Sequence, residues 1–326
     1  MSCLKEIGGY FELEHFSGGL YHDDAIRLNC GRSCLAYLAE LRKMRRAWVP
    51  DWVCDSVPNT LERAGVSVKR YAIGADFLPE YSFAVAPGDW LVLVDYYGQL
   101  CPADVSEALG RSAGRLIVDE TQGFFRQPWA GCDTIYSTRK WFGVSDGGYL
   151  ATSDDSSLER TLPVDMSHER MGFVLGRFEE SAAKYYRAAG DNNRAFGNEP
   201  VKAMSPLTEN LLRAVNYEAA ANRRAENWKV LDGALSSINK LSLHLQEGPF
   251  MYPLMISDAQ RIRKKLIGGK VFVPMLWPDV IENSNSTSWA YRFSTDILPL
   301  PIDQRYGTDE MNRILGLLAE AGVSIG

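Results

Sequence analysis

Hydrophobic and polar positions in the first half of the chain alternate between short apolar runs and segments with helical periodicity. The apolar runs lie at 47–50, 66–73, 89–97 and 116–120. Segments whose apolar residues recur every three or four positions predict helices over 32–46, 52–64 and 102–109. Because short strands alternate with helices from about 25 to 152, the pattern predicts an α/β fold with a largely parallel sheet and crossover helices.

The pattern changes after residue 155. Two longer helices are expected over 167–189 and 205–231, and the polar, turn-rich stretch 190–200 between them is expected to be a loop. The elements expected beyond them are shorter: apolar runs at 250–257 and 270–276, a basic helix at 258–266 and a final helix at 308–321. We therefore expect a large domain over 1–231, including an N-terminal segment, and a smaller C-terminal α+β domain over 232–326.

Two of the strand-like runs end in reactive side chains. The run 116–119 ends at Asp119, with Gln122 three residues later, and the run 133–140 ends at Lys140. In an open α/β sheet, ligands bind outside the carboxyl ends of the strands, so these side chains are expected to face one crevice. A lysine that can form an imine and a carboxylate that can keep a pyridine nitrogen protonated are what a pyridoxal-phosphate site requires.

Such a site also needs an anion-binding turn and a stacking surface. Gly31, Arg32 and Ser33 open the first predicted helix, where backbone N–H groups and the helix dipole favour a phosphate. Ser137 is a second candidate phosphate contact. Trp52 is the preferred stacking residue, with Tyr96 and Tyr97 as rivals. Taken singly, each feature has an ordinary alternative: a surface lysine, a capping aspartate, a capped helix without ligand, or a core aromatic ring.

Composition narrows the function classes. A net charge of −6 and a pI of about 5.4 give no polybasic footprint for nucleic acid or an anionic membrane. No run approaches the roughly 18 apolar residues of a membrane span. Six scattered cysteines without a Cys-x-x-Cys pair are expected to be reduced and mostly buried, which predicts a cytoplasmic protein without a metal site. Dinucleotide and P-loop motifs are missing, which disfavours an oxidoreductase or a nucleoside triphosphatase.

Six segments together resemble one known family. They are LNCGRSCLAYL, VPDWVCDSV, VDYYGQ, IVDETQGFF, STRKWFGVSDGGYL and DILPLPIDQRY, spread over residues 28–306. The chain resembles the DegT/DnrJ/EryC1/StrS sugar aminotransferases, which are pyridoxal-phosphate enzymes of fold type I. The resemblance implies that Lys140 is the imine lysine, that Asp119 and Gln122 form the D-x-x-Q element, and that Gly31–Ser33 form the phosphate loop.

The same resemblance implies partners and substrates. It implies a homodimer with active sites at the interface, and amino transfer from glutamate or a similar donor to a keto sugar linked to a nucleotide. Enzymes of this kind typically serve polysaccharide or secondary-metabolite sugar pathways. Another pyridoxal-phosphate reaction, such as elimination or dehydration, and a non-catalytic regulatory protein with this fold are the alternatives. Dehydratase relatives replace the imine lysine with histidine, so Lys140 favours transamination.

Some positions depart from the family pattern. The family places a serine five residues before the lysine and an asparagine after it, whereas here Ser137 lies three before and Trp141 follows. Asn192 is the candidate for the asparagine that the partner subunit usually brings to the cofactor. Arg292 is a candidate for binding a substrate carboxylate, with Arg139 as a rival, because the planar guanidinium fork fits two oxygens. His22 is expected to line the substrate entrance.

Overall fold

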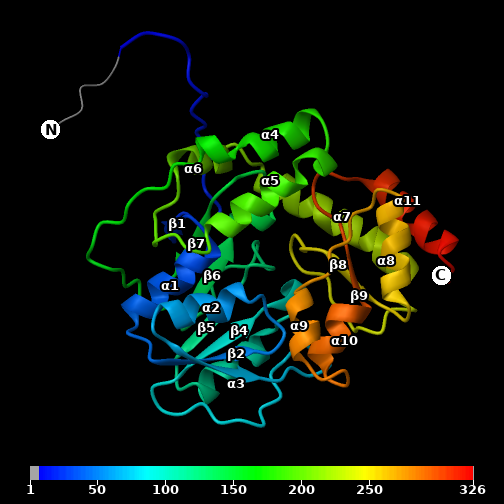
Figure 1. Ribbon diagram of the computed structural model, residues 1–326, viewed down its shortest axis with the longest axis horizontal. Coiled ribbons are helices and arrows are strands. Elements are labelled where there is room, and N and C mark those ends of the chain that lie inside the picture. Colours follow the sequence, from blue (N-terminus) through cyan, green and yellow to red (C-terminus); the bar gives the residue numbers. More distant parts are fainter. Residues whose placement is uncertain (1–6, 326) are drawn as a thin grey trace.

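A seven-stranded sheet lies at the centre of the molecule (Figure 1). The structure is a computed structural model that describes residues 7–325. The strand order is β1-β7-β6-β5-β4-β2-β3; β7 runs antiparallel to both of its neighbours, and the other pairs are parallel. The strands are β1 (Ile26–Leu28), β2 (Arg46–Pro50), β3 (Ser67–Tyr71), β4 (Trp90–Val94), β5 (Leu116–Asp119), β6 (Asp133–Ser137) and β7 (Gly148–Ala151).

Helices cover both faces of this sheet. The α-helices of the described residues are α1 (Gly31–Leu41), α2 (Ser56–Arg63), α3 (Pro102–Arg111), α4 (Gly172–Glu179), α5 (Ala182–Ala195), α6 (Pro206–Leu212), α7 (Tyr217–Leu235), α8 (Ala259–Gly268), α9 (Pro278–Asn283), α10 (Trp289–Asp296) and α11 (Thr308–Glu320). Three short 3₁₀ helices are η1 (Tyr96–Gly98), η2 (Thr138–Lys140) and η3 (His168–Arg170). The predicted mixed sheet flanked by helices is confirmed.

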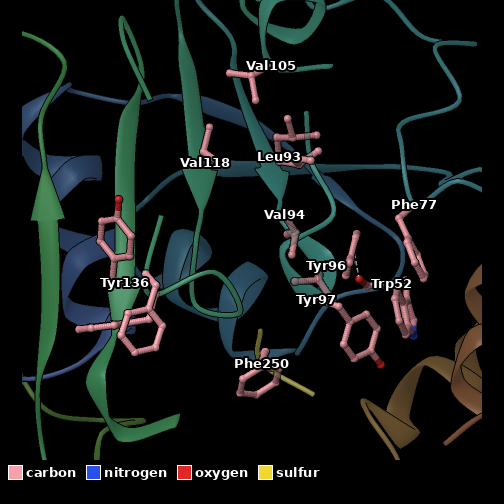
Figure 2. Packing of buried hydrophobic residues seen from close by; sticks show 14 of the residues in the cluster. Trp52, Phe77, Leu93, Val94, Tyr96, Tyr97, Val105, Val118, Tyr136 and Phe250 are labelled. Atoms are coloured by element: carbon pink, nitrogen blue, oxygen red, sulfur yellow. Dashed lines mark hydrogen bonds between the residues drawn. The ribbon is translucent and has the colours of Figure 1, made fainter. Parts of the chain in front are cut away.

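Alternate side chains of the central strands enter two different cores. Val92 and Ile117 pack with the residues of α1, whereas Leu93 and Val118 face the opposite side. Figure 2 shows Leu93 and Val118 in this second core, beside Val105 of α3. Every residue of β4 is buried, as its unbroken apolar run predicted.

The C-terminal part forms a smaller lobe with its own core. Strands β8 (Tyr252–Met255) and β9 (Ile297–Leu300) pair antiparallel, and α8, α11 and the end of α7 pack around them. Trp228 and Leu231 of α7 belong to this core. Helix α7 therefore continues through the predicted boundary at 231, and the division into two domains stays a prediction.

Four predicted elements differ from the structure. The helix expected over 167–189 is interrupted, because the side chain of Ser181 accepts a hydrogen bond from Lys184 N and starts α5 as a new helix. Helix α5 then runs to Ala195, into the stretch 190–200 that was expected to be a loop. The helix expected over 205–231 is divided into α6 and α7, where Asn216 caps α7. The apolar run 270–276 forms no strand. None of the described helices has the length and apolar character needed to cross a membrane.

Candidate active site

The ends of β5 and β6 bring Asp119 and Lys140 to the same edge of the sheet. The two strands are parallel neighbours, with Asp119 paired to Ile135, and η2 carries Lys140 just beyond the end of β6. Thr121 links the two groups: its backbone N–H donates to Asp119 Oδ1 at 2.9 Å, and its Oγ1 accepts from Lys140 Nζ at 2.8 Å. The structure therefore brings together the amine and the acid that the sequence singled out.

The start of α1 lies against the same groups. A side-chain carbon at Gly31 would be 3.6 Å from Thr121 Cγ2 and 3.9 Å from Ser137 Cβ. Gly31 therefore exposes its backbone to the site that contains Thr121 and Ser137. The end of β6 and the first turn of α1 meet at this point, as the strand-end rule predicts.

The surroundings of Lys140 lower the pKa of its amine. Burial of the amine is the main cause that lowers its pKa from the ordinary lysine value, and the positive charges of Arg139 and Arg32 lower it further. The negative charge of Asp119 opposes this shift. Because the residue also keeps exposed surface, water offsets part of the desolvation.

Two predicted cofactor contacts are engaged inside the protein. Ser33 Oγ donates to Asn29 Oδ1 at 2.5 Å, while its backbone N–H donates to Cys30 Sγ at 3.4 Å and so caps α1. Gln122 is buried, and its Oε1 accepts from Tyr97 N at 3.0 Å. Its amide NH₂ is the group that remains for a ligand. The cofactor roles of Ser33 and Gln122 stay predictions.

Trp141, which directly follows the lysine, ties the site to the small lobe. Its indole Nε1 donates to Thr121 O at 3.1 Å, and its carbonyl accepts from Gln304 Nε2 at 2.9 Å. The guanidinium of Arg224 lies 4.4 Å from the centre of the Trp141 ring. Trp141 and Thr121 were missed as site residues by sequence reasoning. The only signal for Trp141 was its position directly after Lys140, and the only signal for Thr121 was its position between Asp119 and Gln122.

Gly147 and Gly148, which follow the lysine segment, have no room for a side chain. Gly147 has φ +116, and a side-chain carbon there would collide with Thr138 Oγ1 and approach Thr208 Cγ2 to 3.2 Å. At Gly148 the same carbon would lie 2.7 Å from the backbone of Cys30. The pair therefore lets β7 start directly against the first turn of α1.

A buried carboxylate pair anchors the loop that leaves β5. Glu120 Oε1 accepts from Trp129 Nε1 at 2.5 Å, and Arg126 Nε lies 3.3 Å from Asp95 Oδ2 and 3.6 Å from Glu120 Oε1. Burial, and then the neighbouring Asp95, raise the pKa of Glu120 well above its usual range. Burial also raises the pKa of Asp95. Burial therefore disfavours the charged form of both carboxyl groups.

The expected stacking aromatics are not accessible in this structure. Trp52 has no exposed surface; its ring lies 4.7 Å from Tyr96, and its Nε1 donates to Ser294 Oγ at 3.0 Å. Figure 2 shows Trp52 packed between Tyr96 and Phe77 inside the core. Tyr97 is equally buried. Trp277 and Phe293 of the C-terminal part cover Trp52, and the prediction that one of the three rings stacks on a ligand stays a prediction.

His22 is a core residue and does not line an entrance. Its ring is 5% exposed, stacks on Tyr136 at 4.0 Å and donates from Nε2 to Phe124 O at 2.8 Å. Burial lowers its pKa to about 4. His22 is therefore neutral near pH 7, and its expected role toward substrate stays a prediction.

Asn192 and Arg292 lie on helices α5 and α10. Asn192 is buried on α5, where its Nδ2 donates to Ser145 O of the same chain at 2.8 Å. Arg292 lies on α10, with its guanidinium 4.1 Å from the centre of the Trp289 ring. Their roles toward cofactor and substrate stay predictions.

Solved structures give the comparison that decides the fold. No family model matches the chain, and no curated protein matches it. The sugar aminotransferase CalS13 from Micromonospora echinospora aligns with a TM-score of 0.64 over 91% of this chain and 87% of that one, at 14% identity. A DegT DnrJ EryC1 StrS aminotransferase from Brucella abortus gives 0.58 over 91% and 85%, at 14% identity. The PLP form of Spr1654 from Streptococcus pneumoniae, described as a sugar aminotransferase, gives 0.64 over 92% and 88%, at 12% identity.

The chain has the fold of these aminotransferases. This confirms the fold class that the sequence resemblance implied, since the alignments cover about nine-tenths of the chain. At such low identity the shared aminotransferase fold says nothing about individual side chains. The chemistry has to be argued from Lys140, Asp119 and their surroundings.

Proposed function

We propose that this chain is a pyridoxal-phosphate-dependent aminotransferase in which Lys140 holds the cofactor. The observation that carries the proposal is the arrangement of Lys140 and the buried Asp119 around Thr121 at one edge of the sheet. The aminotransferase fold supports the same cofactor, because structures with that fold include PLP and PMP forms.

The donor set fits each part of this cofactor. Lys140 supplies the amine for the aldehyde. Asp119 uses Oδ1 for the Thr121 N–H, and no described residue is hydrogen-bonded to Oδ2, so this oxygen is available for the ring nitrogen. The backbone at Gly31 and the hydroxyl of Ser137 suit the phosphate, and the Gln122 amide suits the ring oxygen.

When bound, pyridoxal phosphate supplies the aldehyde that carries the amino group and a ring that accepts the electron pair left on the substrate carbon. Lys140 would remove and return the proton at that carbon, and its lowered pKa favours the neutral amine needed for this. Asp119 would keep a proton at the ring nitrogen. Thr121 Oγ1 would orient Lys140 Nζ, because it already accepts a hydrogen bond from this atom.

We infer that the amino group comes from glutamate or a similar donor and goes to a keto sugar linked to a nucleotide, as in the family that the sequence resembles. The sugar aminotransferases among the structures with this fold support a sugar acceptor. Arg139 and Arg292 remain the candidates for the donor carboxylate. Cys54, an exposed free thiol, supports a reducing compartment and therefore the cytoplasm.

We also infer a homodimer with active sites at the interface. Large apolar side chains are exposed on residues 7–19, which we call the N-terminal arm, and on α4 and α5. Phe11 is 99% exposed, Phe178 is 93% and Tyr186 is 81%. Figure 1 shows the arm leaving the body on the side of α4 and α6. Exposed apolar surface of this kind is typical of a protein–protein interface. Light scattering should give twice the monomer mass, and Phe178→Asp should shift it toward the monomer; a monomeric wild type would contradict the inference.

Mass spectrometry tests the cofactor. The protein is incubated with pyridoxal phosphate, reduced with borohydride and digested, and we expect a phosphopyridoxyl group on Lys140. Lys140→Ala should lose the label and the visible absorption. Lys264→Ala, which alters an exposed lysine of α8, is the matched control and should keep both.

Amino transfer is tested with the loaded protein. Glutamate should yield 2-oxoglutarate in an amount equal to the bound cofactor, with Lys140→Ala inactive. A label on another lysine would overturn the site. A labelled Lys140 without oxoacid from glutamate or other amino donors would overturn the transaminase assignment.

A further inference from the structure

Three arginine side chains gather around one phenylalanine next to the proposed cofactor site. The guanidinium carbons of Arg139, Arg170 and Arg32 lie 4.4, 4.9 and 5.8 Å from the centre of the Phe196 ring. They come from η2, η3 and the first turn of α1, whereas Phe196 follows the end of α5 and is only 4% exposed. We refer to Arg32, Arg139 and Arg170 as the arginine cluster.

The positive charge of this cluster is only partly neutralised. Arg32 and Arg139 both donate to the neutral Asn193 Oδ1, at 2.7 and 3.0 Å, and within residues 7–325 neither has a carboxylate within 4 Å. Arg170 pairs with Asp165 at 2.6 Å, and Lys202 lies 3.8 Å from the same carboxylate. Lys202 also pairs with Glu199 at 3.0 Å, so among the described residues Asp165 is the one carboxylate paired with a member of the cluster.

Two buried polar atoms of this region have no partner among the described residues. They are Nη1 of Arg170 and Oδ1 of Asn192, the residue before Asn193. An unpaired guanidinium N–H in the interior is costly unless a ligand accepts from it. Burial, and then repulsion from Arg32 and Arg170, lower the pKa of Arg139 to about 10, so the like charges are held together at a cost.

The cluster and the proposed cofactor turn use different sides of the α1 start. The backbone of Gly31 faces Thr121 and Ser137, whereas the side chain of Arg32 is turned toward Asn193 and Phe196. A phosphate held by the turn would meet backbone N–H groups and Ser137. Arg139 and Arg170 would still have N–H groups to spare. Guanidinium forks bind the paired oxygens of carboxylates and phosphates alike, and several forks at one point suit a phosphate, which has more oxygens and more charge.

We propose that the arginine cluster is a second phosphate-binding site, which holds a phosphate group carried by the substrate beside the cofactor. The proposal rests on the proposed function for the presence of the cofactor. It assigns to Arg139 and Arg170 the binding of a phosphate, so that Arg139 would not bind the donor carboxylate. The alternative is that the three arginines only pack α5 against the first turn of α1 through cation–π contacts.

Equilibrium binding of inorganic phosphate tests this. Isothermal titration is done on protein saturated with pyridoxal phosphate, so that the Gly31 turn is filled. We expect one phosphate site per chain in the wild type. Arg139→Gln and Arg170→Gln should each weaken it about tenfold, the loss of one charge-assisted contact. Arg45→Gln, at an exposed arginine, is the matched control and should bind as the wild type does.

A conservative variant, Arg139→Lys, separates loss of the guanidinium group from a general loss of folding. Arg139→Lys keeps a positive charge but loses the planar fork, and it should weaken phosphate binding less than Arg139→Gln. Glucose 1-phosphate and uridine diphosphate then serve as competitors. Displacement of phosphate by either supports a substrate site and tells which carrier fits, whereas displacement by neither overturns the substrate role.

The outcomes separate this proposal from the proposed function. Loaded protein that binds no phosphate, or folded Arg139→Gln and Arg170→Gln variants that bind it as tightly as the wild type, would overturn the second site and leave the aminotransferase assignment intact. A chain that takes up no pyridoxal phosphate would overturn the proposed function. Arginine-dependent phosphate binding by that cofactor-free chain would still support an anion site in the cluster.

Discussion

We expect Thr121→Val to lower the pKa of Lys140. Lys140 Nζ donates a 2.8 Å hydrogen bond to Thr121 Oγ1, and an acceptor of this kind stabilises the charged ammonium. Valine keeps the branched shape of threonine but has no oxygen. Burial and the positive charges of Arg139 and Arg32 would then act on the ammonium with only Asp119 and Cys54 opposing them.

The size of the shift follows from the hydrogen bond that is lost. A hydrogen bond to a charged group contributes about 1.5–3 kcal/mol where water is excluded. Lys140 keeps exposed surface, so water replaces part of the lost contact, and about 1 kcal/mol remains. At about 1.4 kcal/mol per pKa unit, the pKa should fall by about 0.7 unit. Thr121→Ser keeps the hydroxyl and should leave the pKa of Lys140 close to the wild-type value.

The shift can be measured in cofactor-free protein by competitive acetylation. Trace acetic anhydride is added at a series of pH values, and mass spectrometry gives the extent of labelling at each lysine. The curve for Lys140 should move to lower pH in Thr121→Val, and the curve for the exposed Lys264 should not move. An unchanged curve would show that the hydroxyl does not support the ammonium. A curve moved to higher pH would show that Thr121 instead donates to the neutral amine.

Three further predictions concern stability, measured by urea unfolding. Because burial lowers the pKa of His22 from 6.5 to about 4, the wild type should lose about 3 kcal/mol as pH falls through that window, and His22→Gln should lose less; equal losses would contradict this. Burial and Asp95 raise the pKa of Glu120, so the native state loses stability as pH rises above the unfolded value of about 4.3. The free energy of unfolding of Glu120→Gln should therefore rise relative to that of the wild type from pH 4 to 8. Parallel curves for the two proteins would refute this. Gly147→Ala should lower the free energy of unfolding by more than about 2 kcal/mol, because the residue has a positive φ and close neighbours. Gly110→Ala, in open space on α3, should leave it unchanged or raise it by up to about 1 kcal/mol. Similar effects of the two substitutions would refute the packing argument.

The positions of Lys140 and Asp119 could be predicted because they depend on local pattern and one general rule. Each follows an apolar run that forms a buried strand, and parallel strands that are neighbours in the sheet end at the same edge. The same reasoning placed Gly31 at the start of α1. The fold class followed from the alternation of strands and helices, which is a property of the whole first half of the chain.

The aromatic and histidine assignments could not be predicted in this way. Trp52 is covered by Ser294 and Phe293, more than 200 positions later in the chain, so nothing near it in the sequence indicates that its ring is enclosed. His22 is enclosed by Phe124 and Tyr136 for the same reason. Aromatic rings and histidines occur both in cores and in sites, and long-range packing decides between them.

Helix α5 shows how tertiary contacts override a local pattern. The sequence GDNN is rich in turn-forming residues, and a loop was expected there, yet α5 continues through it. Asn192 is held by Ser145 O, and Asn193 accepts hydrogen bonds from Arg32 and Arg139. These contacts give the polar side chains partners that they would lack in an isolated helix.

The small lobe takes part in positioning the lysine, although it contributes no predicted catalytic group. Gln304 lies 163 positions after Trp141 and binds its carbonyl, and Arg224 lies over the same indole while donating to Gln304 Oε1 at 2.8 Å. Because Trp141 in turn donates to the carbonyl of Thr121, a movement of the small lobe would move both the residue after Lys140 and the residue that holds its amine. Docking of the two lobes therefore supports the orientation of the amine, and it links the segment DILPLPIDQRY, through Gln304, to the residue that follows Lys140.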